Sequence, residues 1–287
     1  MLKVSFIGAG TVGTALAVLL SRKGYEVTSV YSRSRSSAEK LAAEVSGCRV
    51  AISSQEAADA TDLVFITTPD DAIPDVVSCV KWQKGRGVVH CSGADSTGIL
   101  EPARKSGAMI GGFHPLQTFA GTRQAIENIP GSTFALEAEE PLLTTLKKMA
   151  EDLGGPWITL KAEDKVAYHT AAVFASNYLV TLVKMATDLW KTFSIPTDQA
   201  TRALLPLMHG TLHNIETIGI PHCLTGPIAR GDAGTINKHL DMLQKKAPAL
   251  IFPYKELGLQ TIPVALAKGK INKKRAVELE MILKKGQ

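Results

Sequence analysis

The strongest chemical motif in the sequence is a glycine-rich turn near the N-terminus, Gly8-Ala9-Gly10-Thr11-Val12-Gly13. It follows an apolar run over residues 2–8 and opens a helical pattern over 11–23, which is the context that a dinucleotide fingerprint requires. In such a turn the first glycine permits the tight bend, the second lets the backbone approach a pyrophosphate, and the third lets helix and strand pack closely. The helix N-terminus offers free N–H groups to phosphates. We therefore predict a dinucleotide site here; the alternative is a glycine-rich turn without a ligand.

The residues after the second predicted strand, 26–31, select the dinucleotide. NAD sites usually place an acid about 20 residues past the glycines, where it holds the ribose hydroxyls. This chain has Ser32-Arg33-Ser34-Arg35-Ser36 there and no acid. A carboxylate would repel a 2′-phosphate, whereas a guanidinium binds it through two parallel hydrogen bonds. Ser32, Arg33 and Ser34 therefore predict NADP(H) as the cofactor, while Arg35 alone is equally consistent with a solvated loop charge.

Two further turns should reach the same ligand, because ligands of open parallel sheets lie outside the carboxyl ends of the strands. Thr67-Thr68-Pro69 ends the fourth predicted strand, 63–67, and Ser92 follows the fifth, 88–91. We predict that Thr67, Thr68, Pro69 and Ser92 flank the ribose and the nicotinamide. The alternative is that both are structural turns.

A long apolar helix predicted over residues 165–190 opens on groups that can move a proton. Lys165 and His169 are four residues apart and so share a helix face. Hydride transfer to a carbonyl or imine leaves charge on oxygen or nitrogen, so the protein must supply a proton donor. Burial would lower the pKa of Lys165 toward the range where it can donate. Lys165 and His169 are therefore candidate proton donors; a lysine at the helix entry and a histidine held by core hydrogen bonds are the alternatives.

His114 is the third catalytic candidate, because it follows the predicted strand 108–113 and Pro115 restricts it to an extended conformation. Gln117 is a neutral donor beside it. Ser176 and Asn177 lie among apolar neighbours, where unpaired polar groups are costly, so they need partners from helix carbonyls or from a substrate.

Arg230 is the fourth predicted substrate contact, after Gln117, Ser176 and Asn177. It lies in a loop that contains Gly226, Pro227 and Gly231. An arginine in such a loop can clamp a carboxylate through two hydrogen bonds. A structural ion pair between Arg230 and Asp232 is the alternative.

The elements that must position these residues change character along the chain. Short β-rich runs alternate with helical patterns up to residue 160, which predicts βαβ units and a mainly parallel sheet covered on both faces. Beyond that point helices are predicted over 165–190, 197–218, 232–246 and 273–285. We therefore predict an α/β Rossmann-like NADP-binding domain at 1–160 and an all-α domain for substrate binding and dimerisation at 161–287.

The composition excludes several classes of protein. The chain has 287 residues, of which 45% are hydrophobic and 21% charged, as in ordinary globular proteins. Its four cysteines form no CxxC pair or Cys/His cluster, which argues against disulfides and a metal site and fits the cytoplasm. The net charge of +5 is mild, and no basic stripe predicts a nucleic-acid partner.

One segment has the length of a membrane span. Residues 166–183 contain no Asp, Glu, Lys or Arg. They do include several polar residues, and no companion span exists, so we expect a helix buried inside a soluble protein with no membrane partner. The glycines at 8, 10 and 13 likewise argue against a signal peptide at residues 1–21. The apolar faces of the C-terminal helices are expected to pack on each other and on a second subunit, as in a homodimer.

The first 155 residues resemble the NADP-binding domain shared by pyrroline-5-carboxylate reductases, β-hydroxyacid dehydrogenases and ketopantoate reductases. More narrowly, residues 112–119 (GFHPLQTF) and 224–232 (LTGPIARGD) resemble a bacterial family of predicted oxidoreductases. In that family a Rossmann-like domain precedes a helical domain of unknown function. In the hydroxyacid dehydrogenases and ketopantoate reductases a lysine opens the interdomain helix and an asparagine follows one turn later. Lys165 matches the lysine, and His169 stands in place of the asparagine.

The resemblance implies a reductase and agrees with the residue-level interpretation. Together they predict transfer of a hydride between NADPH and a small carbonyl acid, ketopantoate-like or β-hydroxyacid-like. An imine reductase of the pyrroline-5-carboxylate reductase type is the alternative among enzymes. A non-catalytic NADP-binding sensor is the alternative outside enzymes, and it predicts cofactor binding without turnover.

Overall fold

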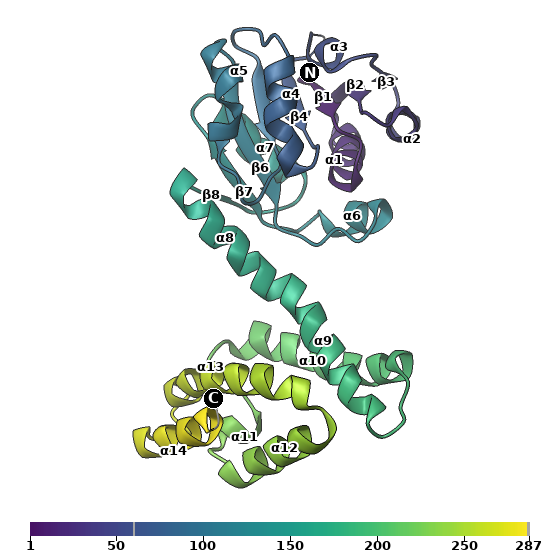
Figure 1. The fold of residues 1–287 in the computed structure, drawn as a ribbon. Coiled ribbons are helices and arrows are strands. Elements are labelled where there is room, and N and C mark those ends of the chain that lie inside the picture. The colour runs from purple at the N-terminus through teal and green to yellow at the C-terminus, as the bar shows by residue number, and fades with distance from the viewer. Residues whose placement is uncertain (60, 286–287) are drawn as a thin grey trace. The chain divides into compact units, whose positions relative to one another are not determined.

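The computed structural model describes residues 1–59 and 61–285. Its N-terminal part is built on one eight-stranded sheet of order β3-β2-β1-β4-β5-β6-β7-β8 (Figure 1). Neighbouring strands are parallel except β6 and β7, so the predicted mainly parallel sheet is confirmed. The strands are β1 (Lys3–Ile7), β2 (Glu26–Tyr31), β3 (Arg49–Val50), β4 (Leu63–Ile66), β5 (Gly87–His90), β6 (Met109–Pro115), β7 (Phe134–Ala138) and β8 (Trp157–Thr159).

Helices cover both faces of the sheet (Figure 1). The two sheet faces carry separate apolar cores, so the central strands are apolar on both sides; all four residues of β4 are buried. Stacked and edge-on rings of Phe6, Phe65, Phe113 and Phe134 run across one core. One face is covered by α1 (Thr11–Arg22), α2 (Arg35–Glu44), α6 (Thr122–Asn128) and α7 (Leu142–Asp152), the other by α3 (Ser54–Asp59), α4 (Ile73–Cys79) and α5 (Glu101–Lys105).

The strand order creates a crevice at the end of β1. From β1 the chain crosses to β2 and β3 on one side, and then returns to β4 on the other. Connections that leave in opposite directions part at the carboxyl ends of β1 and β4, which is where open α/β sheets bind ligands. The predicted glycine turn and the turn at Thr67 both lie at this point.

A helix of 30 residues, Ala162–Lys191, joins the sheet region to the helical region. It consists of a 3-10 turn, α8 (Lys165–Ala172), a π-helical turn (Val173–Asn177) and α9 (Tyr178–Lys191). By length and composition alone the helix could cross a membrane, although core helices of soluble proteins pass the same test. The expectation that it is buried inside the chain is wrong: none of its apolar window is buried, and Val166, Phe174 and Val180 are 65%, 67% and 71% exposed. The absence of charged residues shows that the surface of this helix is apolar. It does not show that other residues of the same chain bury that surface.

The contacts divide the chain into two compact units, residues 1–177 and 178–287. The second unit is all-α, as predicted, with α9, α10 (Thr197–Ile218), α11 (Gly226–Ala229), α12 (Ala233–Lys246), α13 (Ile251–Ala267) and α14 (Lys273–Lys284). Its core contains Ile236, Ile262, Leu279 and Leu283.

The sequence does not predict α5, α6, α11 or α13. The prolines at 253 and 263 and Gly258 are residue types typical of loops. For that reason the sequence did not predict α13, a helix of 17 residues. Gly258 has a packing reason: a Cβ there would lie 3.0 Å from Leu283 Cδ1 of α14. The helix predicted over residues 55–60 is α3, and the predicted end at Ala60 lies outside the described residues.

Candidate functional site

The first candidate site is a cavity of about 400 Å³ at the carboxyl edge of β1, β2 and β4. It brings together most of the residues predicted to hold the cofactor, which come from three separate turns. They are Gly8, Ala9, Gly10, Ser32, Arg33, Ser34, Thr67, Thr68 and Pro69. Thr11, Val12 and Gly13 form the first turn of α1 directly behind this cavity.

The three glycines of the turn have different structural roles. Gly8 has a φ of +113°, and a Cβ there would lie 2.6 Å from the carbonyl carbon of Thr67. A Cβ at Gly13 would lie 2.3 Å from Thr67 Oγ1, which itself donates to the carbonyl of Gly8 at 2.8 Å. Gly10 differs, because its φ of −78° suits any residue and the nearest atom to a Cβ would be Thr67 O at 4.0 Å. The fold therefore requires Gly8 and Gly13, whereas the space beside Gly10 is open.

The polar groups of this cavity fit a phosphorylated ligand. The hydroxyl of Thr68 is buried and has no hydrogen-bond partner within the described chain. Arg33 is exposed and forms no ion pair with any described residue, whereas Arg35 pairs with Glu39 at 2.9 Å. Ser34 caps α2 by accepting from the Ser37 N–H. Arg33, rather than Arg35, is thus the guanidinium available to a 2′-phosphate.

A second cavity, of about 710 Å³, lies at the end of β6. Rings that line it include His114 on β6 and Tyr168 and His169 on α8. Gln117, Ser176 and Asn177 also line it, the last two from the π-helical turn. Such turns occur frequently at functional sites because they re-aim side chains. The structure therefore brings five predicted site residues together.

Tyr168 is a further lining residue that the sequence argument missed. Its hydroxyl lies 2.8 Å from His114 Nδ1, and the ring centroids of His114 and His169 are 6.3 Å apart. Its position three residues after Lys165, on the same helix face, was the available sequence signal. Gly93 leaves room for the rings, because a Cβ there would lie 2.8 Å from His114 Nε2 and 2.7 Å from His169 Cδ2.

Burial keeps the paired groups of this cavity neutral at pH 7. Desolvation, with added repulsion from Lys165 and His169, lowers the pKa of His114 to about 4. Desolvation also raises the pKa of Tyr168 to about 12. Both side chains therefore offer uncharged hydrogen-bonding groups to a ligand.

Lys165 is a buried ionisable group near the cavity, with 1% exposure. Its Nζ donates to the carbonyl of Ser92 at 2.9 Å. Burial lowers the pKa of Lys165, and the nearby charges of Glu137, Cys91, Asp95 and Asp70 oppose that shift. Lys165 is not among the described residues that line the His114 cavity, so this ammonium lies behind the cavity wall.

The side chain of Ser92 is engaged within the protein. Its hydroxyl contacts Asp70 Oδ2 at 2.8 Å and Asp95 Oδ2 at 3.0 Å, and it accepts from the Asp95 N–H. The backbone carbonyl of Ser92 accepts the hydrogen bond from Lys165. Its predicted contact with the nicotinamide stays a prediction.

Arg230 belongs to the second unit, where it lines a cavity of about 330 Å³ with Thr225, Lys268 and Lys270. Asp232 caps α12 by accepting from the N–H and hydroxyl of Thr235, at 2.9 and 2.7 Å. The ion pairs formed by the described residues do not include one between Arg230 and Asp232. Within residues 1–59 and 61–285, no group of three His, Cys, Asp or Glu side chains is suited to a metal ion.

Comparison with protein families matches two successive parts of the chain, and the second match begins within the sheet region, before β7. Residues 1–115 match a Rossmann-like domain, and residues 132–261 match a domain of unknown function, DUF2520. No curated protein sequence matches the chain.

Solved structures extend the likeness over nearly the whole chain. A Bacteroides fragilis protein described as a candidate NADP oxidoreductase is 26% identical, with a TM-score of 0.73 over 91% of this chain and 98% of that one. A Thermotoga maritima protein is 28% identical, with a TM-score of 0.74 over 93% and 99%. A reductive aminase from Aspergillus terreus in complex with NADPH and ethyl levulinate is 14% identical, with a TM-score of 0.68 over 97% and 99%. At that identity the likeness shows a shared fold.

Proposed function

Since the chain joins a Rossmann-like domain to a DUF2520 domain, as its sequence resemblance implied, we propose that it is an NADP-dependent oxidoreductase that reduces a small carbonyl acid. The observation that carries this proposal is the open space at Gly10, in one cavity with the Thr68 hydroxyl and the Arg33 guanidinium, neither of which has a side-chain partner among the described residues. NADPH, when bound, would supply the hydride. The likeness to a candidate NADP oxidoreductase supports the same assignment.

In this proposal each turn of the first cavity holds one part of the cofactor. The backbone of residues 8–13 faces the pyrophosphate, and Ser32, Arg33 and Ser34 face the 2′-phosphate. Thr67, Thr68, Pro69 and Ser92 flank the ribose and the nicotinamide. The Thr68 hydroxyl gains the partner that it lacks within the described chain.

Replacing Arg33 by alanine is expected to weaken NADP binding about tenfold to hundredfold, because a hydrogen bond to a charged group contributes about 1.5–3 kcal/mol. NAD affinity should change less than about twofold, since NAD lacks the 2′-phosphate. Calorimetric titration with each nucleotide measures both. Arg35→Ala is the matched control, because Arg35 already pairs with Glu39. Equal losses of NADP and NAD affinity in the Arg33 variant would rule out this role.

In the second cavity we assign proton donation to Lys165 and hydrogen bonding of the substrate to His114 and His169. Lys165 lies behind the cavity wall, and its ammonium can lose a proton because burial lowers its pKa. Neutral His114 polarises the substrate oxygen as a hydrogen-bond donor. Gln117, Ser176 and Asn177 contact the remaining polar atoms of the substrate. Arg230, which lines a separate cavity in the second unit, is proposed to bind a carboxylate there.

The charge around the cavity favours a carbonyl acid over an imine. No carboxylate is among the described lining residues, so none is placed to stabilise a cationic iminium inside the cavity. Such a site stabilises an oxyanion and disfavours a cationic iminium. Imine reduction is the second candidate function, because the chain shares its fold with a reductive aminase. Oxidation of NADPH against a panel of 2-oxo acids, semialdehydes and cyclic imines separates them. Cofactor binding without turnover of any compound would instead identify a sensor.

We also propose that the exposed apolar faces of α9 and α10 pack against a second copy of the chain. Replacing Leu207 by glutamate should convert a homodimer into a monomer, because a charge at that interface would lose its hydration. Sedimentation velocity measures the change. Val277→Glu on α14 is the control, since Val277 is also exposed. A monomeric unsubstituted protein would refute the proposal. The residues concerned are Val180, Leu182, Leu205, Leu207, Leu212, Ile215 and Ile218.

A further inference from the structure

The buried Lys165 ammonium has more hydrogen-bonding capacity than its described contact uses. An ammonium carries three N–H donors, and Nζ reaches one acceptor, the carbonyl of Ser92. Water does not satisfy the others, because Lys165 is 1% exposed. Burying a charge is costly unless an opposite charge compensates it. The charged state of Lys165 therefore needs a counter-charge close to Nζ.

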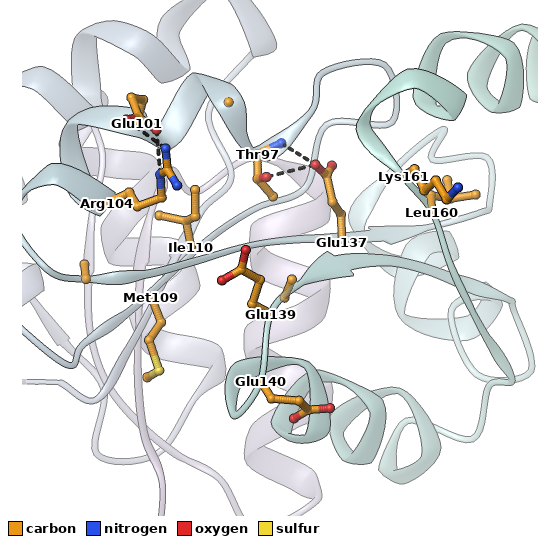
Figure 2. Close-up of a pocket in the computed structure, with 13 residues that line it drawn as sticks. Thr97, Glu101, Arg104, Met109, Ile110, Glu137, Glu139, Glu140, Leu160 and Lys161 are labelled. Atoms are coloured by element: carbon orange, nitrogen blue, oxygen red, sulfur yellow. Dashed lines mark hydrogen bonds and ion pairs between the residues drawn. The ribbon is translucent and has the colours of Figure 1, made fainter.

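Glu137 on β7 has a carboxylate oxygen that lacks a hydrogen-bond donor among the described residues. Its Oε1 accepts from the N–H and hydroxyl of Thr97, at 3.1 and 2.8 Å, as Figure 2 shows. Its Oε2 is buried and has no donor in the described part of the chain. A carboxylate can accept about four hydrogen bonds, so half of this group remains available.

Gly112 on β6 lets the two side chains approach. It pairs with Glu137 in the β6–β7 register. A Cβ at residue 112 would lie 3.6 Å from Lys165 Nζ and 3.6 Å from Glu137 Cβ. Any larger residue would fill the space that the ammonium and the glutamate share.

The other ionisable groups around Lys165 are neutral or already engaged. Burial raises the pKa of the Cys91 thiol to about 12 and lowers that of His90 to about 3 and of His114 to about 4. Asp70 and Asp95 both contact the Ser92 hydroxyl. Glu137 is thus the acid facing Lys165 that has a buried oxygen to spare.

Glu137 also has access to water. It lines a cleft of about 690 Å³ together with Glu101, Arg104, Glu139 and Lys161 (Figure 2). This cleft shares no lining residue with the His114 cavity. In this cleft Arg104 pairs with Glu101, which leaves it unavailable to Glu137. Glu137 is half-buried at the edge of this cleft, and its charge acts on Lys165 although the two form no direct ion pair among the described residues.

We propose that Glu137 is a positioning residue whose carboxylate serves as the counter-charge of Lys165 and keeps that lysine protonated for proton donation. This role rests on the proposed reductase function for its purpose, but the pairing itself is testable without a substrate. It also explains why a charge can persist behind the cavity wall.

A double-mutant cycle of Glu137→Gln and Lys165→Met tests the pairing. Glutamine keeps an oxygen for Thr97 but removes the charge. Urea unfolding is followed by the fluorescence of Trp82, which is buried in the first unit, in a background with Trp157 and Trp190 replaced by phenylalanine. We expect the two substitutions to be coupled by about tenfold in the unfolding equilibrium constant, as for residues that interact directly. Additive effects would overturn the proposal.

The pH dependence of stability distinguishes the loss of the Glu137 charge from a change in side-chain packing. Losing the carboxylate lowers the pKa of Lys165 further, so Glu137→Gln should destabilise most near pH 7, where Lys165 is charged. The difference should shrink as pH rises toward 10.5, the ordinary pKa of lysine. A pH-independent difference would indicate a merely structural role for Glu137 and refute the proposal. Glu139→Gln, in the same cleft, is the matched control and should show no coupling to Lys165.

The outcomes also distinguish this proposal from the proposed function. Coupling without turnover of any panel compound would reject the reductase and retain the Lys165–Glu137 pair. Where turnover is found, Glu137→Gln should move the alkaline limit of the rate to lower pH, and Glu137→Asp should restore part of the shift.

Discussion

Alanine at position 10 is expected to lower the affinity for NADPH about hundredfold while the free energy of unfolding changes by less than about 1 kcal/mol. The backbone at Gly10 has an ordinary φ, and a new Cβ would meet no protein atom closer than 4.0 Å. The same Cβ would occupy the space through which a pyrophosphate approaches the backbone. Calorimetric titration and urea unfolding measure the two effects separately.

Gly8→Ala is the informative contrast. At a φ of +113° and 2.6 Å from the Thr67 carbonyl carbon, an added Cβ strains the turn itself. We expect this variant to lose about 2 kcal/mol or more of stability along with its NADPH affinity. If Gly10→Ala binds NADPH as the unsubstituted protein does, no pyrophosphate passes beside residue 10, and the cofactor site is assigned wrongly.

The features that local rules determine were predictable from the sequence. Gly8 and Gly13 mark a strand–turn–helix unit, and the run 63–67 predicts a strand covered on both faces, because these patterns depend on neighbours in the chain. The meeting of His114 with His169 was predictable only in outline, since it needs the end of β6 and the start of α8 to lie together.

Features that depend on distant partners were missed. Glu137 faces Lys165 because an antiparallel pairing of β6 and β7 places it opposite Gly112, and nothing in the sequence near Glu137 indicates that register. In α13, Pro263 and Gly258 resemble loop residues, yet packing against α14 overrides their weak helical preference. The apolar run after Lys165 led to the expectation of a helix buried inside the chain, but such a run shows only that a surface is apolar and not which chain covers it.

Replacing Lys165 by methionine should lower turnover by about 10²- to 10⁴-fold, the usual contribution of a positioned proton donor. NADPH affinity should stay within about twofold, because Lys165 is not part of the cavity that holds the glycine turn. The rate of NADPH oxidation, with whichever panel compound is reduced, measures the first effect, and calorimetry measures the second. Lys161→Met is the matched control, since Lys161 is an exposed lysine one turn earlier.

The pH dependence of the rate should follow the protonation of Lys165. Reduction requires the protonated ammonium, and burial lowers the pKa of Lys165, so the rate should be full at low pH and fall as pH rises through a value below 10.5. In Lys165→Met that alkaline limb should disappear together with most of the rate. A variant that keeps both the rate and the limb would transfer proton donation to the His114–Tyr168 pair, whose groups are neutral at pH 7 and 2.8 Å apart. Neither the proton nor the charge of Lys165 would then be needed for the reaction.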